Sequence, residues 1–266
     1  MKHLFSIFLL TFLWTSLHAS ASESRDKYNF NSGWLLSVGD KSGAEKINYA
    51  DADWKEVTLP YAFNENEAFR LSIEQLTDTI VWYRKHFRLP ANNHQKKVFI
   101  EFEGVRQGAD FYINGKYIGV MAVGFDLTPH IKYGQENVIA IRIDNNWDYK
   151  ERNTDTKYQW NNRNFNANYG GIPKNVWLHV TDKLYQTLPL YSNLKTTGVY
   201  VYADDIHVKS RKATIHAESQ IKNEHRKNKL VSYQVEVIDR DKNTVKTFSC
   251  EPVLVKPGET ATLKAA

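Results

Sequence analysis

Apolar and polar residues alternate with a period of two along much of this chain. In residues 98–103 (VFIEFE) every second side chain is apolar and falls on one face of an extended segment. Such alternation is typical of a strand that buries one face and leaves the other in solvent. Two further strands, at 111–113 and 117–120, flank Asn114-Gly115, a dipeptide that favours a two-residue hairpin turn. The pattern predicts antiparallel strands and an all-β fold.

The alternating pattern continues on both sides of this stretch. It predicts strands at 80–89, 138–143 and 177–180, and a second series that begins near Ile206, with strands at 214–217, 232–238, 245–248 and 253–254. Residues 144–168 have no apolar period but contain five aromatic residues. A loop of that length inside a compact domain is usually functional, so we expect a binding role there.

The N-terminus has the features of a secretory signal. A short basic start precedes an apolar run from Leu4 to Leu17, and Ala19-Ser20-Ala21 supplies the small residues that a signal peptidase requires. We expect residues 1–21 to be removed and the protein to be periplasmic or extracellular. A membrane anchor is the alternative, but the run is shorter than the roughly 20 residues that span a bilayer. No cysteine stands directly after the run, which excludes a lipoprotein anchor there.

Composition narrows the list of partners. Cys250 is the only cysteine, so no disulfide forms within the chain and a buried core must supply the stability. The formal charge of +5 is spread along the chain, which makes nucleic acid or an anionic membrane a poor partner. Residues 239–243 (DRDKN) resemble the start of a calcium loop, but Thr244 and Cys250 stand where that loop needs Gly and Glu. We therefore expect a hairpin turn, no metal and no cofactor.

Two stretches carry a family resemblance. They are residues 101–131 (EFEGVRQGADFYINGKYIGVMAVGFDLTPHI) and 168–176 (NYGGIPKNV). Both resemble the N-terminal sugar-binding jelly-roll domain of glycoside hydrolase family 2, which includes β-galactosidases and β-glucuronidases. Lys174 stands near the position where that family usually has Arg. The resemblance extends in order from Phe30 to Val180.

The resemblance implies a domain order. A jelly-roll, galactose-binding-like β-sandwich is expected at 28–182, a linker at 183–205 and an immunoglobulin-like sandwich at 206–266. An immunoglobulin-like sandwich needs about seven strands. The pattern after Ile206 predicts four or five, so we expect this second domain to be incomplete and the chain to be a fragment.

The resemblance also places the catalytic chemistry outside the chain. In family 2 the two catalytic glutamates lie in a (β/α)₈ barrel that follows the sandwich, so no catalytic residue is assigned here. Glu101 and Glu103 share one strand face and lie about 7 Å apart, but a solvated strand face explains them better than a hydrolytic pair. We expect the fragment to be inactive alone and to pack against its own barrel, with a homo-oligomer possible in the full-length protein.

Candidate substrate-binding residues lie in and just after the long loop. The family usually presents an Asp to the sugar a few positions before the Asn-Tyr motif, and here Phe165 has that spacing. The candidates are therefore its polar and aromatic neighbours, namely Trp160, Asn164, Asn166, Asn168 and Tyr169. The asparagines can instead cap turns, and Trp160 can instead pin the loop to the sheet.

Two functional hypotheses follow. The first is an exported family 2 glycosidase that hydrolyses O-glycosyl bonds of β-linked sugars, with this chain as its accessory domain. The second is a stand-alone carbohydrate-binding module without catalysis. In both cases the partner is a carbohydrate.

Overall fold

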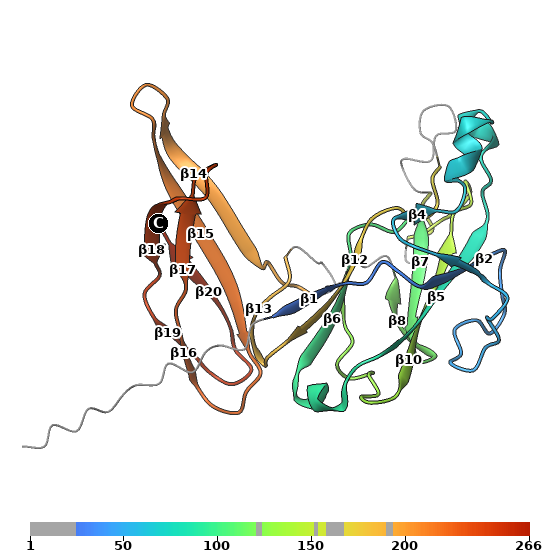
Figure 1. The fold of residues 1–266 in the computed structure, drawn as a ribbon, viewed down its shortest axis with the longest axis horizontal. Coiled ribbons are helices and arrows are strands. Elements are labelled where there is room, and N and C mark those ends of the chain that lie inside the picture. Colours follow the sequence, from blue (N-terminus) through green and yellow to red (C-terminus); the bar gives the residue numbers. More distant parts are fainter. Residues whose placement is uncertain (1–24, 121–123, 152–153, 158–167, 190–193) are drawn as a thin grey trace, which may run out of the picture.

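The chain folds into two β lobes in the computed structural model (Figure 1). The described residues are 25–120, 124–151, 154–157, 168–189 and 194–266. The helical segments in these ranges are three short 3-10 turns, at Glu65–Phe69, Ile73–Gln75 and Ala91–Gln95. The predicted all-β fold class is confirmed. The predicted signal peptide, residues 1–21, lies outside the described ranges.

The first lobe is a sandwich of two antiparallel sheets. The larger sheet has the order β3 (Lys55–Val57), β2 (Trp34–Val38), β5 (Ile80–Arg88), β10 (Glu136–Asp144), β7 (Gly108–Ile113), β8 (Lys116–Val120). The smaller sheet has the order β1 (Asp26–Asn29), β12 (Val176–Thr181), β6 (Lys97–Phe102), β9 (Gly124–Asp126). A two-stranded ladder joins β4 (Tyr61–Ala62) to β11 (Gly171–Ile172). The strands expected at 80–89, 138–143 and 177–180 are confirmed.

Aromatic side chains fill the space between the two sheets. Phe102 of β6 contacts Phe111 of β7 with ring centroids 5.1 Å apart, and Phe111 contacts Phe125 of β9 at 4.8 Å. All three rings are buried. Each tilted aromatic pair at such a distance stabilises the fold by about 0.5–1.5 kcal/mol beyond the stabilisation that comes from the buried area itself. The core therefore lies between the sheets, as alternating strands require.

The hairpin predicted around Asn114-Gly115 is confirmed. β7 and β8 pair across these two residues, whose φ angles are 52° and 81°. Both central positions of this turn need positive φ, which asparagine and glycine adopt at the least cost. The Asn114 side chain also donates to His130 O at 3.0 Å and so attaches the turn to a neighbouring loop.

The prediction that β6 leaves one face in solvent is wrong. All six residues of this strand are buried. On the face away from the core, Phe99 packs on Tyr185 of the second lobe with ring centroids 5.2 Å apart. On the same face Glu101 lies 2.7 Å from Nε2 of His179 in the neighbouring strand. Tyr185 of the second lobe and the buried contact between Glu101 and His179 therefore occupy the face that the alternation predicts to be in solvent.

The second lobe begins earlier than the sequence predicts. Its main sheet has the order β13 (Leu184–Gln186), β15 (Lys212–Asn223), β14 (Val199–His207), and β20 (Thr260–Ala265) also pairs with β15. β13 thus lies within the segment 183–205 that the sequence predicts to be a linker, and β14 begins there. β14 was missed because all nine of its residues are exposed, so no buried face sets a period.

The remaining strands of the second lobe form two short antiparallel pairs. They are β16 (Lys229–Val231) with β19 (Val253–Val255), and β17 (Gln234–Ile238) with β18 (Thr244–Ser249). A small core around Ile221, Cys250 and Leu263 lies between these pairs and the main sheet. Eight strands are described in this lobe, and six of them, β15 to β20, lie wholly within 206–266, where we expect four or five. The turn predicted at Asp239–Asn243 is confirmed, with Asp239 Oδ1 accepting from the Asn243 backbone at 2.8 Å.

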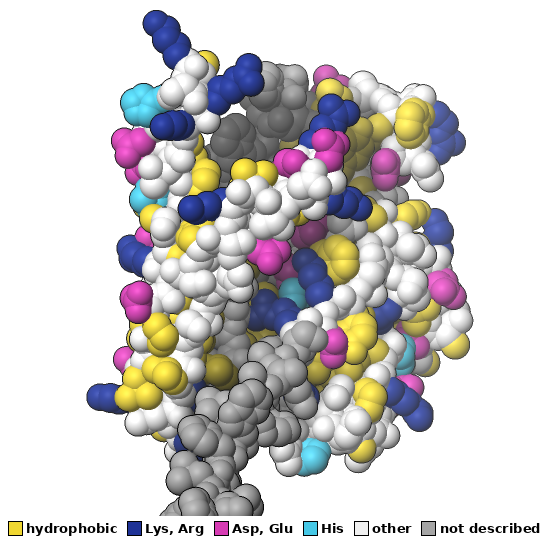
Figure 2. Space-filling view, turned by 60° about the vertical axis from the view of Figure 1, so that its left-hand side comes forward, with side chains coloured by type: hydrophobic (Ala, Val, Ile, Leu, Met, Phe, Trp, Pro, Cys, Tyr) yellow, Lys and Arg dark blue, Asp and Glu magenta, His cyan; other side chains and the backbone are white. Residues whose placement is uncertain are grey.

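Charged side chains of both signs are interspersed on the face of the molecule that Figure 2 shows. Such a surface presents no extended field of one sign to a polyanion. Within the described ranges, no helix has the length and apolar character needed to cross a membrane.

A lysine joins the two lobes. Lys97 Nζ lies 2.6 Å from Asp126 Oδ2 in the first lobe and 3.0 Å from Glu224 Oε2 in the second. The hydroxyl of Tyr185 donates to the other oxygen of Glu224 at 2.8 Å. Burial alone lowers the pKa of Lys97, but its ion pairs with Asp126 and Glu224 more than offset this, so the pKa is raised. The ammonium group stays charged and holds the lobes together.

A second buried ion pair stabilises the outer face of the large sheet. The side chain of Arg84 is fully buried, and its Nε donates to Asp51 Oδ2 at 2.6 Å. Its Nη1 donates to the carbonyl of Lys46 at 3.0 Å and also to that of Ala44. Burial raises the pKa of Asp51, but the contacts with His86 and Arg84 more than offset this and hold it below its ordinary value.

We expect Asp51→Asn to destabilise the first lobe by about 3–5 kcal/mol, because it leaves a buried guanidinium without its counter-charge. The pKa of Asp51 is depressed on folding, so the wild-type pair contributes fully above the ordinary aspartate pKa of about 3.9 and is lost as the pH falls through the folded value. Urea unfolding of both proteins at neutral and acidic pH measures this. If the difference in free energy of unfolding between the two proteins is as large in acid as at neutral pH, Asp51 is not the charged partner of Arg84.

We expect Lys97→Met to lower the free energy of unfolding by about 2 kcal/mol, because two carboxylates at the junction lose a charged donor. The raised pKa means that this contribution is present at neutral pH and is lost only as the pH rises above the ordinary lysine range. Lys264→Met is the matched control, since Lys264 also contacts a glutamate, Glu218, at 2.7 Å but its side chain is 69% exposed. Exposed pairs contribute about 0–1 kcal/mol. Equal losses in the two variants would show that Lys97 is not a structural junction.

Candidate functional site

The predicted substrate-binding residues fall into two groups. Trp160, Asn164 and Asn166 lie outside the described residues. Asn168 and Tyr169 are described and have opposite environments, since Asn168 is fully buried and Tyr169 is 37% exposed.

Asn168 uses its polar atoms within the fold. Its Nδ2 donates to the carbonyl of Asn145 at 2.7 Å, and Nδ2 of Asn145 donates back to the carbonyl of Asn168 at 3.1 Å. Its Oδ1 accepts from Nε of Arg106 at 3.3 Å. Asn168 thus has the hydrogen bonds of the turn-organising role that is the alternative to sugar binding, and its contact with a sugar stays a prediction.

Asn64 completes what we call the asparagine cluster, formed by Asn64, Asn145 and Asn168. Asn64 Nδ2 donates to the carbonyl of Asn168 at 2.8 Å, across 104 residues of sequence. Its Oδ1 accepts from the backbone amide of Gly170 at 3.1 Å. All three asparagines are fully buried. The cluster therefore joins three loops at one end of the sandwich.

Gly170 and Gly171 make the close approach possible. A Cβ on Gly170 would lie 2.4 Å from the amide of Asn145 and 2.5 Å from the ring of Phe63. A Cβ on Gly171, whose φ is +114°, would lie 2.3 Å from the hydroxyl of Tyr83. Only residues without a side chain fit there. The backbone of Gly171 also exchanges two hydrogen bonds with Arg106, at 2.7 and 2.9 Å.

Tyr169 is the exposed member of this segment. It lies between two buried residues, Asn168 and Gly170, whose polar groups bond to the asparagine cluster. A ring on so constrained a backbone loses little further conformational freedom on contact with a ligand. Sequence reasoning identified Tyr169 but missed Asn64, Asn145 and Arg106. The only local signal was the position of Asn145, just after a predicted strand.

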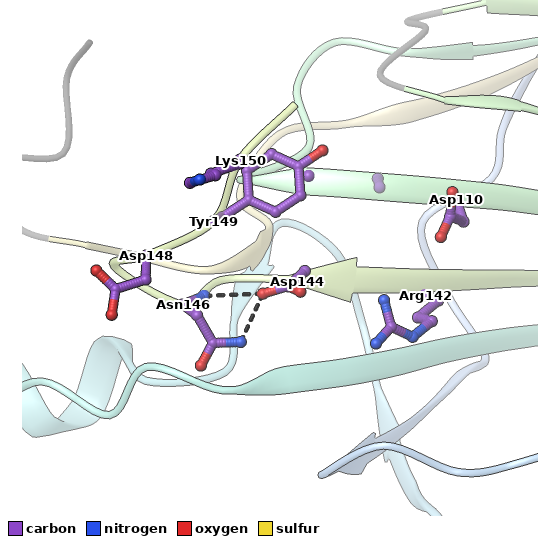
Figure 3. A pocket seen from close by; sticks show the side chains of 9 residues that line it. Asp110, Arg142, Asp144, Asn146, Asp148, Tyr149 and Lys150 are labelled. Carbon is purple, nitrogen blue, oxygen red and sulfur yellow. Dashed lines mark hydrogen bonds between the residues drawn. The ribbon is translucent and has the colours of Figure 1, made fainter. Parts of the chain in front are cut away.

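A pocket of about 410 Å³ lies beside the cluster, on the face of the large sheet away from the core (Figure 3). Arg142 of β10 pairs with Asp110 of β7, and Asp144 pairs with Gly108. Asn146 holds the carboxylate of Asp144, since its backbone and side-chain nitrogens both donate to Asp144 Oδ1, at 3.1 and 2.6 Å. Tyr149 and Lys150, from the start of the long loop, complete the wall. We call this the Tyr149 pocket.

The carboxylates that most resemble a hydrolytic pair have other partners. Glu101 lies against His179, and Glu103 accepts from Trp177 Nε1 and Asn175 Nδ2, both at 2.8 Å. These hydrogen bonds from Trp177 and Asn175 lower the pKa of Glu103, so it is a poor proton donor near neutral pH. Within the described part of the chain, no group of three or more His, Cys, Asp or Glu side chains is arranged to hold a metal ion.

Comparison with known proteins identifies the family to which the chain is similar. Residues 55–178 match the family model described as glycosyl hydrolase 2 galactose-binding domain-like. A β-glucuronidase of Formosa agariphila is 41% identical over 251 residues, which cover 90% of this chain and 25% of that protein. A β-galactosidase of Thermoanaerobacter pseudethanolicus is 35% identical over 162 residues, 59% of this chain and 21% of that protein.

Solved structures agree with this result. A β-glucuronidase from glycoside hydrolase family 2 superimposes with a TM-score of 0.80 at 38% identity, covering 91% of this chain and 26% of its own. A Bacteroides uniformis β-glucuronidase shares the fold, with a TM-score of 0.75 at 21% identity over 91% of this chain and 27% of its own. This chain thus spans about a quarter of the length of these relatives. The matches cover both lobes, and we conclude that the chain belongs to glycoside hydrolase family 2 and contains the galactose-binding-like domain of that family.

Proposed function

We propose that this chain is the N-terminal part of an exported glycosidase that hydrolyses β-linked sugars, with β-glucuronides as the first substrate class to test. The observation that carries the proposal is the 41% identity to a β-glucuronidase across 90% of the chain. That identity extends through both lobes, beyond the 55–178 range of the family model. If the two proteins shared only the accessory domain, their sequence identity would not need to extend into the second lobe.

In this proposal the bond-breaking carboxylates belong to the rest of the protein. Glycoside hydrolysis needs two carboxyl groups placed about 5–10 Å apart around the glycosidic oxygen. In the described part of the chain, Glu101 and Glu103 are held by structural contacts with His179, Trp177 and Asn175. Export is proposed from residues 1–21, whose basic start, apolar run and small residues have the order of a signal peptide.

The contribution of this chain would be a fixed edge for the substrate pocket. Tyr169 is exposed and sits on a backbone that the asparagine cluster and two glycines hold in place. A phenol ring offers an apolar face to the C–H groups of a sugar and a hydroxyl to its oxygens. We therefore assign to Tyr169 a contact with the bound sugar in the whole protein.

The activity is tested with chromogenic β-glycosides. We expect the whole protein to hydrolyse p-nitrophenyl β-D-glucuronide or the matching galactoside, and residues 22–266 alone to hydrolyse neither, because in this proposal the pair of positioned carboxylates belongs to the rest of the protein. Circular dichroism shows whether the isolated chain is folded during the assay. Turnover by the isolated chain, or a folded whole protein inert on both substrates, would overturn the proposal.

The role of Tyr169 is tested by Tyr169→Ala in the whole protein. Loss of an aromatic contact of about 0.5–1.5 kcal/mol should lower kcat/KM two- to tenfold, with little change in Tm because the side chain is exposed. Tyr200→Ala, an exposed tyrosine of the second lobe, is the control and should leave kcat/KM unchanged. If both variants match the wild type, Tyr169 does not contact the sugar.

A further inference from the structure

We propose that an apolar arm of the first lobe is a surface on which the catalytic part of the same protein docks. The arm, which we call the Phe69 arm, comprises residues 64–77 between β4 and β5. Its tip carries three large apolar side chains in solvent, since Phe69 is 84% exposed, Leu71 45% and Ile73 42%. The inference rests on the proposed function in taking a catalytic part to belong to the same polypeptide.

The tip of the arm is exposed over a continuous stretch. Every residue from Phe69 to Gln75 is exposed, and the three apolar residues alternate with polar ones. Single apolar residues are common on protein surfaces, whereas a group of them on one segment marks an interaction site. Figure 1 shows the arm, in cyan, at the end of the first lobe that lies away from the second lobe. The second lobe therefore leaves the tip uncovered.

The base of the arm is closed by hydrogen bonds between its two ends. Oε2 of Glu67 accepts from the backbone amide of Thr77 at 2.6 Å, and Oε1 accepts from the Thr77 hydroxyl at 2.7 Å. Nδ2 of Asn64 donates to the carbonyl of Thr77 at 2.8 Å. Leu76, just before Thr77, is buried. A tip on such a base loses little conformational freedom when it docks, which lowers the entropic cost of association.

The base of the arm is also bonded to the segment that carries Tyr169. Asn64 donates to the carbonyl of Asn168 at 2.8 Å and accepts from the amide of Gly170 at 3.1 Å, on either side of Tyr169. The proposed function places Tyr169 against a sugar held by the catalytic part. A catalytic part that reaches Tyr169 must lie against this end of the sandwich, from which the arm projects. This chain spans about a quarter of the length of its relatives, so a partner of sufficient size belongs to such a protein.

The charges of the arm define the kind of surface that fits it. Arg70 lies between two of the apolar residues, is exposed, and makes no ion pair within the described part of the chain. Aromatic and arginine side chains are enriched where protein surfaces meet. An apolar depression with an acidic side chain at its rim therefore complements the tip. An anionic lipid surface does not, because the arm has three carboxylates for its one guanidinium, at Glu65, Glu67 and Glu74.

The test is hydrogen–deuterium exchange, measured by mass spectrometry on the whole protein and on residues 22–266. We expect the amides of residues 65–77 to exchange at least about tenfold more slowly in the whole protein, because docking suppresses local opening of the arm. The exposed turn at 208–211 in the second lobe reports any general slowing. Equal exchange rates of the arm in the two proteins would overturn the proposal. The measurement needs no substrate, so its result is independent of the hydrolysis assay.

The variant Phe69→Ser separates docking from a role within the first lobe. We expect it to lower the Tm of the whole protein by about 2–4 °C and to leave the Tm of residues 22–266 unchanged, because the side chain is covered only in the whole protein. Val208→Ser is the matched control, since Val208 is 83% exposed, and it should change neither Tm.

Three results with Phe69→Ser would contradict the proposal. An equal fall of Tm in both proteins would show that Phe69 packs within its own lobe. An unchanged Tm in both would show that nothing docks on the arm. A dimer of residues 22–266 that Phe69→Ser dissociates, measured by sedimentation velocity, would assign the arm to a second copy of this chain.

Discussion

The close contact of two adjacent glycines with their neighbours sets the geometry of one whole end of the sandwich. Gly170 lies against Asn145 and Phe63, and Gly171 lies against Tyr83, at distances that no side chain permits. This approach lets β11 pair with β4 and lets Asn64 bond across the gap. Without it, the three loops that carry the asparagine cluster would have unpaired buried amides, each costing about 1–3 kcal/mol.

Local signals in the sequence were sufficient for most of the first lobe. The turn at Asn114-Gly115 and the strand at 80–89 depend on neighbouring residues, and alternation shows such features directly. The burial of Phe99 was not predictable in this way, because Tyr185 covers it from another lobe. β14 was missed for the opposite reason, since all its residues are exposed and its only strand partner is β15.

The candidate site shows why a sequence motif predicts where a segment lies better than it predicts what each of its side chains does. The Asn-Tyr-Gly-Gly segment was located from its resemblance to a family, and it does lie at a junction of loops. Yet an asparagine amide suits a turn and a sugar equally well, and only the partner decides between them. The partner of Asn168 at position 64 is 104 residues away, so no local pattern could identify it.

The asparagine cluster and the Tyr149 pocket share backbone. Arg106 donates to Asn168 of the cluster, and the next residue, Gln107, donates to Asn146 at the pocket. Likewise Asn145 belongs to the cluster, and the next residue, Asn146, lines the pocket. A change that moves one site must therefore move the other.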